Sequence, residues 1–393
     1  MTSISHSEAP VQRRSAPRTA SRNFALDHVR SFLTLVVVLH HAVIPYTYFG
    51  HTDSKSWIGF DVVVTATDSF FMAAFFFLSG LFVWPSLSHK STVTHLRDRL
   101  LRLGLPFVIA AVTVIPLAYY AIALRDNPDL TFTAFWWKTV TVGPWPSGPI
   151  WFVWVLFAYD LLATALYGLS PNLLDPVNRL SEQCLNRPVR FFLFLLVVTA
   201  IVYVPARIYY SPSRWFEFGP FSVQASRILL YAAYFFIGAG AGAANLNQGV
   251  LSADGRLAKS SRNWLVATII PYALMWVMIY IKREILGNPD TQPIWYLAIY
   301  GLLFVTFSAA ILFAILGFFL GSKRPWNMLN RMQGDAYGIF LVHYPIVLWL
   351  QYWLFDYDLP AIVKATIVFV PAVILSWGVA ASLRKLPGAS HVL

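Results

Sequence analysis

The sequence predicts an all-α, polytopic membrane protein: a helical bundle of about ten transmembrane helices with both termini in the cytoplasm. Of its 393 residues, 58% are hydrophobic and only 12% are charged, about half the charged share of a soluble protein. The mean hydropathy is +0.60. Apolar runs long enough to span a bilayer as helices recur along the whole chain. The net charge of +11 comes from basic residues in loops between these runs, so no nucleic-acid partner is expected.

Ten apolar segments define the predicted spans. In chain order they are 28–49, 68–87, 103–124, 149–169, 190–209, 226–245, 264–283, 294–320, 334–354 and 361–383. The eighth is long enough to tilt or kink within the bilayer. Residues 132–148 are rich in aromatic residues, Pro and Gly, which favours an interfacial or re-entrant element beside the fourth span.

The distribution of Lys and Arg predicts the orientation. Basic residues concentrate in the N-terminal tail and in alternate loops, and this places both termini in the cytoplasm. We expect a disordered cytoplasmic tail at 1–23, one membrane domain at 24–386 and a short cytoplasmic tail at 387–393. The single cysteine, Cys184, provides neither a disulfide framework nor a thiolate metal site, and no metal is expected.

Arg30 and His41 are the polar positions that point most clearly to chemistry. They lie in the first apolar segment, LDHVRSFLTLVVVLHHAVIPY. Their spacing turns a helix by three turns and about 20°, so they share one face, about 16 Å apart along the axis. The orientation puts Arg30 at the cytoplasmic end and His41 in the outer half. An ionisable group at that depth indicates function, and histidine is the usual general base near neutral pH.

The alternative for His41 is a structural histidine that is bonded to a backbone carbonyl or a polar side chain. His40 points about 100° away and is the weaker candidate for the base. Asp68 is the candidate that orients His41, because it begins the predicted second span at the outer side. Its alternative role is a helix N-cap in the sequence TDSF.

A second cluster, HLRDRLLRLGLPF at 95–107, precedes the third span at the predicted cytoplasmic face. Arg99 and Arg102 share one helix face, and two adjacent guanidinium groups bind phosphate oxygens well. Together with Arg30, they predict a clamp for a phosphate-rich carrier whose reactive end extends towards His41. The alternative is that these arginines only fix the topology, since basic residues flank spans on the cytoplasmic side in any case.

Five motifs resemble, in order along nearly the whole chain, the acyltransferase 3 family of integral membrane acyltransferases. LDHVRSFLTLVVVLHHA resembles the first-helix signature, in which an Arg is followed after ten residues by a His, and RLLR (99–102) resembles the RxxR element. The later motifs are FFFLSGLFV (75–83), GPIWFVWVLFAYDLL (148–162) and AYGIFLVHYPIV (336–347). The Phe-rich composition is closest to the glucans biosynthesis protein C-like branch.

The resemblance implies an enzyme that moves an acyl group, acetyl or succinyl, from cytoplasmic acyl-CoA to a hydroxyl of a carbohydrate or related cell-envelope acceptor. It implies that His41 is catalytic and that the matching arginines bind acyl-CoA or have a structural role. His343 and Tyr337 match the late Tyr/His motif, and with Trp151 they form the expected substrate-binding set; a buried structural role is the alternative for His343. Such a protein is expected as a multi-pass protein in the bilayer of a bacterial inner membrane.

A transporter or flippase for a polar or anionic substrate is the rival function. Ten spans with His, Asp and Arg inside the membrane, Arg227 included, suit a transporter. Against it, no paired half-repeats with interrupted helices are found in the sequence. The GAGAG sequence at 238–242 lies inside an apolar segment, so it predicts a helix-packing face and not a dinucleotide loop.

Overall fold

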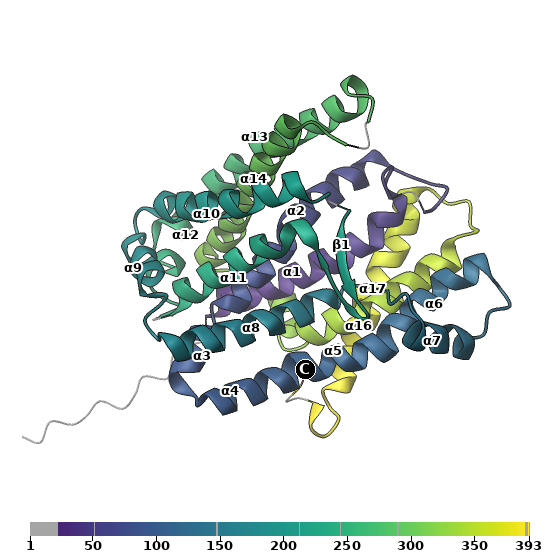
Figure 1. Cartoon of the computed structure of the whole chain (residues 1–393), viewed down its shortest axis with the longest axis horizontal. Helices are drawn as coiled ribbons and strands as arrows, with labels where there is room; N and C mark the ends of the chain where they lie inside the picture. The colour runs from purple at the N-terminus through teal and green to yellow at the C-terminus, as the bar shows by residue number, and fades with distance from the viewer. Residues whose placement is uncertain are drawn as a thin grey trace, which may run out of the picture.

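The computed structural model describes residues 23–50, 52–146, 148–211, 213–243, 245–288, 291–389 and 392, and within them ten long helices form a bundle (Figure 1). They are α1 (Phe24–Val43), α2 (Ile58–Gly80), the continuous helix α4 to α6 (Thr92–Asp126), α8 (Trp151–Leu169), α10 (Pro188–Tyr209), α11 (Ile228–Gly242), α13 (Ser261–Tyr280), α14 (Ile294–Gly321), α16 (Ala336–Leu354) and α17 (Ala361–Leu383). All except α16 are long and apolar enough to cross a bilayer. Helix α16, the ninth in chain order, is more polar because it carries His343 and Gln351 among its 19 residues. The predicted polytopic helical bundle is confirmed.

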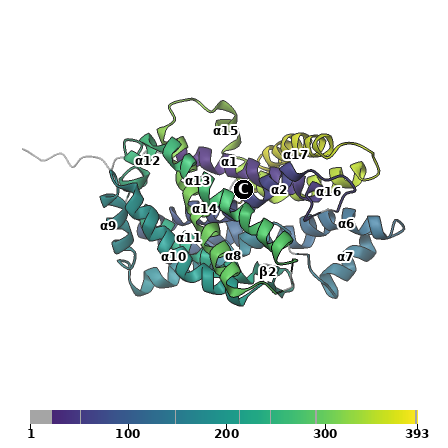
Figure 2. The ribbon, with the colours of Figure 1, turned by 90° about the horizontal axis from the view of Figure 1, so that it is seen from above.

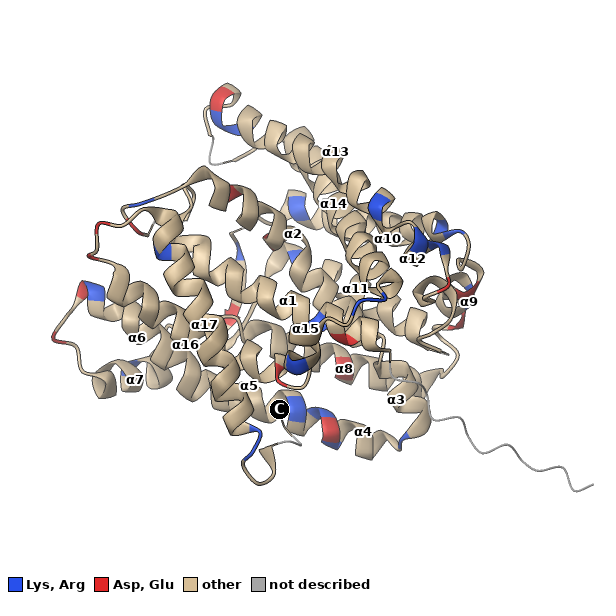
Figure 3. Ribbon diagram, turned by 180° about the vertical axis from the view of Figure 1, so that it is seen from behind, with Lys and Arg blue, Asp and Glu red and all other residues tan. Residues whose placement is uncertain are grey.

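Short elements cap both ends of the bundle. They are α3 (Val83–His89), α7 (Phe132–Thr141), α9 (Asp175–Gln183), α12 (Arg256–Lys259), α15 (Asn327–Met332) and the strands β1 (Trp215–Phe218) and β2 (Phe221–Gln224). Helices α9 and α12 lie at one end and α7 lies at the other in both views (Figures 1 and 2). Lys and Arg gather around α12 and along α4 (Figure 3). We call the end with α9 and α12 the predicted cytoplasmic end and the other the predicted outer end.

Helix α1 lies at the centre of the bundle. Its N-terminus is capped by Asn23, whose side chain accepts a hydrogen bond from the Leu26 amide. It contacts α2, α14, α16 and α17, and buried residues such as Leu33 and Val37 line these contacts. The predicted tail at 1–23 lies outside the described residues apart from Asn23. The boundary at 387 between the membrane domain and the C-terminal tail stays a prediction.

The third long helix contains two π-helical turns, Leu100–Gly104 and Ala110–Val114. Each precedes a proline that has no N–H to donate to the carbonyl four residues earlier. For Pro106 that carbonyl belongs to Arg102, and the Tyr337 hydroxyl donates to it at 2.7 Å. For Pro116 it belongs to Val112, and the indole nitrogen of Trp136 in α7 donates to it at 2.7 Å. Side chains from other elements therefore satisfy both carbonyls.

Helix α2 begins ten residues earlier than the predicted span, at Ile58 instead of 68. The N-cap role weighed for Asp68 is therefore wrong, because Asp68 lies in the middle of the helix. The predicted span starts too late because Asp61 and Asp68 are charged, and charged residues normally end a span. Both are paired inside the bundle: Asp61 accepts hydrogen bonds from the amides of Tyr48 and Phe49, and Asp68 pairs with Arg227.

Glycines bring α2 and α11 into backbone contact, as the GAGAG sequence predicts. A Cβ atom on Gly238 would lie 2.2 Å from the carbonyl oxygen of Phe77, and one on Gly242 would lie 2.1 Å from that of Leu81. Only glycine permits such an approach. The contact fixes α11 against α2, and this brings Arg227, just before α11, beside Asp68.

A β-hairpin between α10 and α11 has no counterpart among the predicted elements. Its two-residue loop, Gly219-Pro220, has φ +58° at the glycine, as a tight turn of type II′ requires. Trp215 pairs with Gln224 at its open end. The indole nitrogen of Trp154 in α8 donates to the Ser222 carbonyl at 2.8 Å and attaches the hairpin to the bundle.

Candidate functional site

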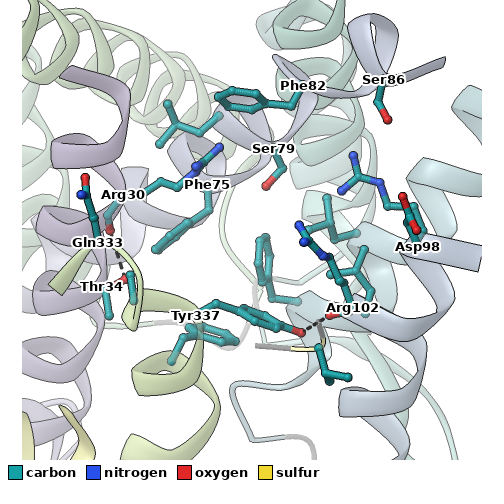
Figure 4. Close-up of a pocket in the computed structure, with 18 of the residues that line it drawn as sticks. Arg30, Thr34, Phe75, Ser79, Phe82, Ser86, Asp98, Arg102, Gln333 and Tyr337 are labelled. Carbon is teal, nitrogen blue, oxygen red and sulfur yellow. Dashed lines mark hydrogen bonds between the residues drawn. The ribbon is translucent and has the colours of Figure 1, made fainter. Parts of the chain in front are cut away.

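A cavity of about 510 Å³ opens among α1, α2, the third long helix, α8 and α16 towards the predicted cytoplasmic end. We call it the arginine pocket. Four cations, Arg30, Lys90, Arg99 and Arg102, and one acid, Asp98, contribute to its wall. Arg30 and Arg102 point into it from opposite sides (Figure 4). The structure thus brings the three predicted clamp arginines into one cavity, whereas Arg97 is not part of its wall.

The three clamp arginines differ in what holds them. Arg99 approaches the buried Asp160 with its Nε 3.4 Å from Oδ1. Arg30 lies over the ring of Phe82 with its Cζ 4.4 Å from the centroid. Arg102 is positioned through its backbone, whose carbonyl accepts the Tyr337 hydroxyl. The guanidinium groups of Arg30 and Arg99 are therefore held at the wall, and a polyanionic ligand is the natural complement of the summed charge of the three arginines.

Asp160 is the internal counter-charge of this pocket. It is 1% exposed and lies 3.8 Å from Nε2 of His95, in addition to its contact with Arg99. Asp160 is therefore paired with the side chains of His95 and Arg99 inside the bundle. These contacts hold α8 against α4, the helix that carries His95 and Arg99.

A second cavity of about 210 Å³ follows along α1 towards the predicted outer end. We call it the histidine pocket. His40 and His41 of α1, Asp68 of α2 and Arg227 supply its ionisable groups. Its remaining wall is largely aromatic: Phe71, Tyr119, Trp151, Trp215, Tyr231, Phe340 and Tyr344. Asp68 and the predicted substrate residue Trp151 therefore share one cavity with His41.

His41 is half-buried and is surrounded by rings. Its ring centroid lies 5.3 Å from that of His343 and 5.0 Å from that of Tyr344, both in α16. Within the described part of the chain, neither nitrogen of His41 has a hydrogen-bond partner, which the structural-histidine alternative would require. An unbonded imidazole in a cavity is available to accept a proton from a bound hydroxyl.

His40 is bonded instead. Its Nδ1 lies 2.7 Å from the Thr67 hydroxyl, and that hydroxyl donates to the Val63 carbonyl at 2.9 Å. The single Thr67 proton is thereby used, so Nδ1 of His40 is the donor and Nε2 carries the lone pair in the neutral ring. His40 links α1 to α2, which is a structural role.

Asp68 and Arg227 form the ion pair of the histidine pocket. Nη1 of Arg227 donates to Oδ1 of Asp68 at 2.9 Å and to the Asp68 carbonyl at 3.1 Å, while Nη2 donates to Oδ2. The Asp68 side chain is 45% exposed although it lies in mid-helix, so the cavity around it is wide enough to admit water. The hydrogen bonds of Asp68 go to Arg227, and its predicted role in orienting His41 stays a prediction.

The two late-motif residues fall in different places. Tyr337 lines the arginine pocket, on the side of the predicted acyl-CoA site. His343 is fully buried behind His41, and its Nδ1 donates to the Phe340 carbonyl at 2.7 Å. A carbonyl only accepts, so Nε2 of His343 carries the lone pair, and it has no partner among the described residues.

Sequence reasoning missed three residues of these cavities. Phe340 lines both pockets, Tyr344 contacts His41, and Trp215 of the hairpin closes the histidine pocket. The sequence signal for the first two was their helical spacing with Tyr337, which puts one face of α16 towards α1. Trp215 carried no such signal because the hairpin itself was unexpected.

Comparison with known proteins gives the chain its family. The model of the acyltransferase 3 family, described as an acyltransferase domain, matches residues 23–381. No curated protein and no solved structure matches the chain. The match covers the predicted spans except for the last two residues of the tenth, and it favours acyl transfer over transport. The chain belongs to the acyltransferase 3 family and is a multi-pass membrane acyltransferase.

Proposed function

We propose that the protein is an O-acyltransferase that moves an acetyl or succinyl group from acyl-CoA in the arginine pocket to a hydroxyl of an acceptor in the histidine pocket. The observation that carries this proposal is the serial arrangement of the two cavities. Arg30 lines the first and His41 lines the second, on one face of one helix. A carrier with charged phosphates and a narrow arm matches a cationic pocket that is followed along the helix by a half-buried base.

The charges of the arginine pocket support acyl-CoA as the donor. Four cations and one acid line its wall, and guanidinium groups bind phosphates in bidentate fashion. Its volume of about 510 Å³ falls in the range of cofactor and ligand sites. Opening towards the predicted cytoplasmic end, it faces the compartment in which acyl-CoA is made.

The aromatic wall of the histidine pocket supports a carbohydrate acceptor. Trp151 stacks on Tyr231 with centroids 5.5 Å apart and meets Trp215 at 5.9 Å. Broad aromatic surfaces pair with the apolar faces of sugar rings, while Gln224 and Asp68 offer hydrogen bonds to hydroxyls. We infer a glucan or a related cell-envelope carbohydrate, modified at the outer side of a bacterial inner membrane.

The chemistry follows from one proton transfer. His41 takes the proton of the acceptor hydroxyl while its oxygen attacks the thioester carbonyl. The new C–O bond forms, the C–S bond breaks, and the departing CoA sulfur receives the proton from His41. An acyl group carried transiently on His41 is the alternative, and it would appear as label retained on the protein when no acceptor is present.

The test is release of free CoA by purified protein in lipid nanodiscs, with labelled acetyl-CoA or succinyl-CoA and a glucan oligosaccharide acceptor. The wild type is expected to release CoA only when acceptor is added, with label appearing on the carbohydrate. His41→Gln is expected to reduce the rate by 10²-fold or more. His40→Gln is the matched control, because its amide can still donate to Thr67, and it should retain most of the activity. Full activity of His41→Gln would refute the assignment of the base.

A further inference from the structure

The boundary between the two pockets can be located on two neighbouring helices, α1 and α2. On α1 the boundary falls between Thr34 and Val37, which line the arginine pocket and the histidine pocket respectively. On α2 it falls between Phe75 and Met72. These intervals correspond to about one helical turn, or about 5 Å along the axis. A layer one turn thick therefore separates the cavities.

Three phenylalanines form this layer. Phe75 of α2, Phe152 of α8 and Phe340 of α16 all line the arginine pocket, and Phe340 lines the histidine pocket as well. Their centroids are 5.7 Å apart for Phe75 and Phe152, 5.6 Å for Phe152 and Phe340, and 6.3 Å for Phe75 and Phe340. We call these three residues the phenylalanine septum.

The septum differs from an ordinary aromatic core because one of its rings, Phe340, adjoins a cavity on each side. In a close-packed interior, a Phe ring cannot change rotamer without displacing its neighbours. Phe340 adjoins a cavity of about 510 Å³ on one side and one of about 210 Å³ on the other. A Phe340 ring that leaves the layer therefore enters a cavity instead of displacing close-packed neighbours.

We propose that the phenylalanine septum is a gate between donor and acceptor sites, and that Phe340 with the small cavity behind it selects short acyl groups. This inference rests on the proposed function. The gate is closed in the structure described here, and the arm of acyl-CoA opens it by displacing the Phe340 ring. A closed septum keeps water and ions from crossing the bundle between turnovers.

The size of the histidine pocket sets the selection. At about 210 Å³ it is less than half the size of the arginine pocket, at about 510 Å³. The acyl group and the acceptor hydroxyl must share this smaller space beside His41. A short acyl group leaves room for the acceptor, and each added methylene takes room from it. Truncation of Phe340 joins the two cavities and relieves this limit.

The first experiment tests the gate without any chemistry. Met72, which lines the histidine pocket and is 6% exposed, is replaced by Cys in a Cys184→Ala background. A membrane-impermeant maleimide is then added on the side of the arginine pocket. We expect at least tenfold faster labelling after Phe340→Ala than with Phe340 intact. Phe318→Ala, a truncation of a half-exposed Phe on α14, is the matched control and should leave the rate unchanged. Equal rates with and without Phe340 would overturn the gate.

The second experiment tests the selection. We expect Phe340→Ala to raise kcat/KM for hexanoyl-CoA relative to acetyl-CoA by about tenfold, a typical effect of added room in an apolar pocket. Phe340→Leu provides a milder variant with an intermediate shift, should the alanine protein fold poorly. An unchanged ratio in both variants would overturn the selection. If acetyl transfer occurs but neither labelling nor the ratio changes, the septum inference fails and the proposed function stands. Faster labelling without any acyl transfer refutes the proposed function alone.

Discussion

Replacing Asp68 by Asn removes the negative charge that Arg227 meets inside the bundle. Arg227 makes three hydrogen bonds to Asp68, two of them to the carboxylate. The amide of Asn can still accept one hydrogen bond, but its NH₂ group faces a guanidinium nitrogen that also only donates. Besides that amide, Arg227 keeps two acceptors. They are the main-chain carbonyl of residue 68 at 3.1 Å and the Tyr231 hydroxyl at 3.5 Å.

The magnitude follows from the burial of the two partners. Breaking a buried ion pair costs about 3–5 kcal/mol because the remaining charge is uncompensated. The Arg227 side chain is 9% exposed, but that of Asp68 is 45% exposed, so we expect the lower limit, about 3 kcal/mol. With an unfolding entropy typical of a chain of this length, that loss lowers the midpoint of thermal unfolding by about 4 °C.

The assay is thermal denaturation of purified protein, read by size-exclusion chromatography after heating. The double variant Asp68→Asn/Arg227→Gln should recover part of the loss, because no unpaired charge remains. Asp129→Asn, in an exposed loop, is the control and should change stability by less than about 0.5 kcal/mol. An Asp68→Asn protein as stable as the wild type but without acyl transfer would refute this reasoning. It would show that Asp68 acts on His41 and not through Arg227.

Three further predictions concern other parts of the chain. Arg102→Gln should raise KM for acyl-CoA about tenfold or more with little change in kcat, since one charged hydrogen bond to phosphate contributes about 1.5–3 kcal/mol; an unchanged KM would exclude Arg102 from the clamp. Asp53→Ala should cost about 3–5 kcal/mol of stability in the heating assay, because it strips two of the three acceptors from the fully buried Lys364; an unshifted midpoint would contradict this. Burial raises the pKa of the Cys184 thiol, so a smaller fraction of it is thiolate at neutral pH. Maleimide should therefore label Cys184 in the folded protein slowly, at a rate that rises with pH. Rapid labelling at pH 7 would show that the thiol is accessible.

The parts of the fold that depend on local sequence could be predicted. Apolar runs gave ten helices, and the helical spacing of Arg30 and His41 gave a shared face that leads from one cavity to the next. The cluster of Arg99 and Arg102 could be identified as the cationic wall because helix geometry alone brings them together. The glycines at 238 and 242 indicated close helix contact because no other residue permits it.

The parts that depend on pairing between distant segments could not be predicted. Asp68 looked like a helix boundary because its partner, Arg227, is 159 residues away in sequence. Phe340 looked like any apolar residue of a span, and only the convergence of four helices makes it a divider between two cavities. The hairpin residue Trp215 lines the histidine pocket and contacts Trp151, which no local pattern indicates.

A structure of the protein with a thioether analogue of acetyl-CoA bound is the most direct test of acyl transfer between the two pockets. We expect the phosphates to contact Arg30, Arg99 and Arg102. We also expect a displaced Phe340 ring, with the acyl carbonyl within hydrogen-bonding reach of the acceptor space beside His41. Phosphates bound away from these arginines, or an acyl group that ends outside the histidine pocket, would contradict transfer between these pockets.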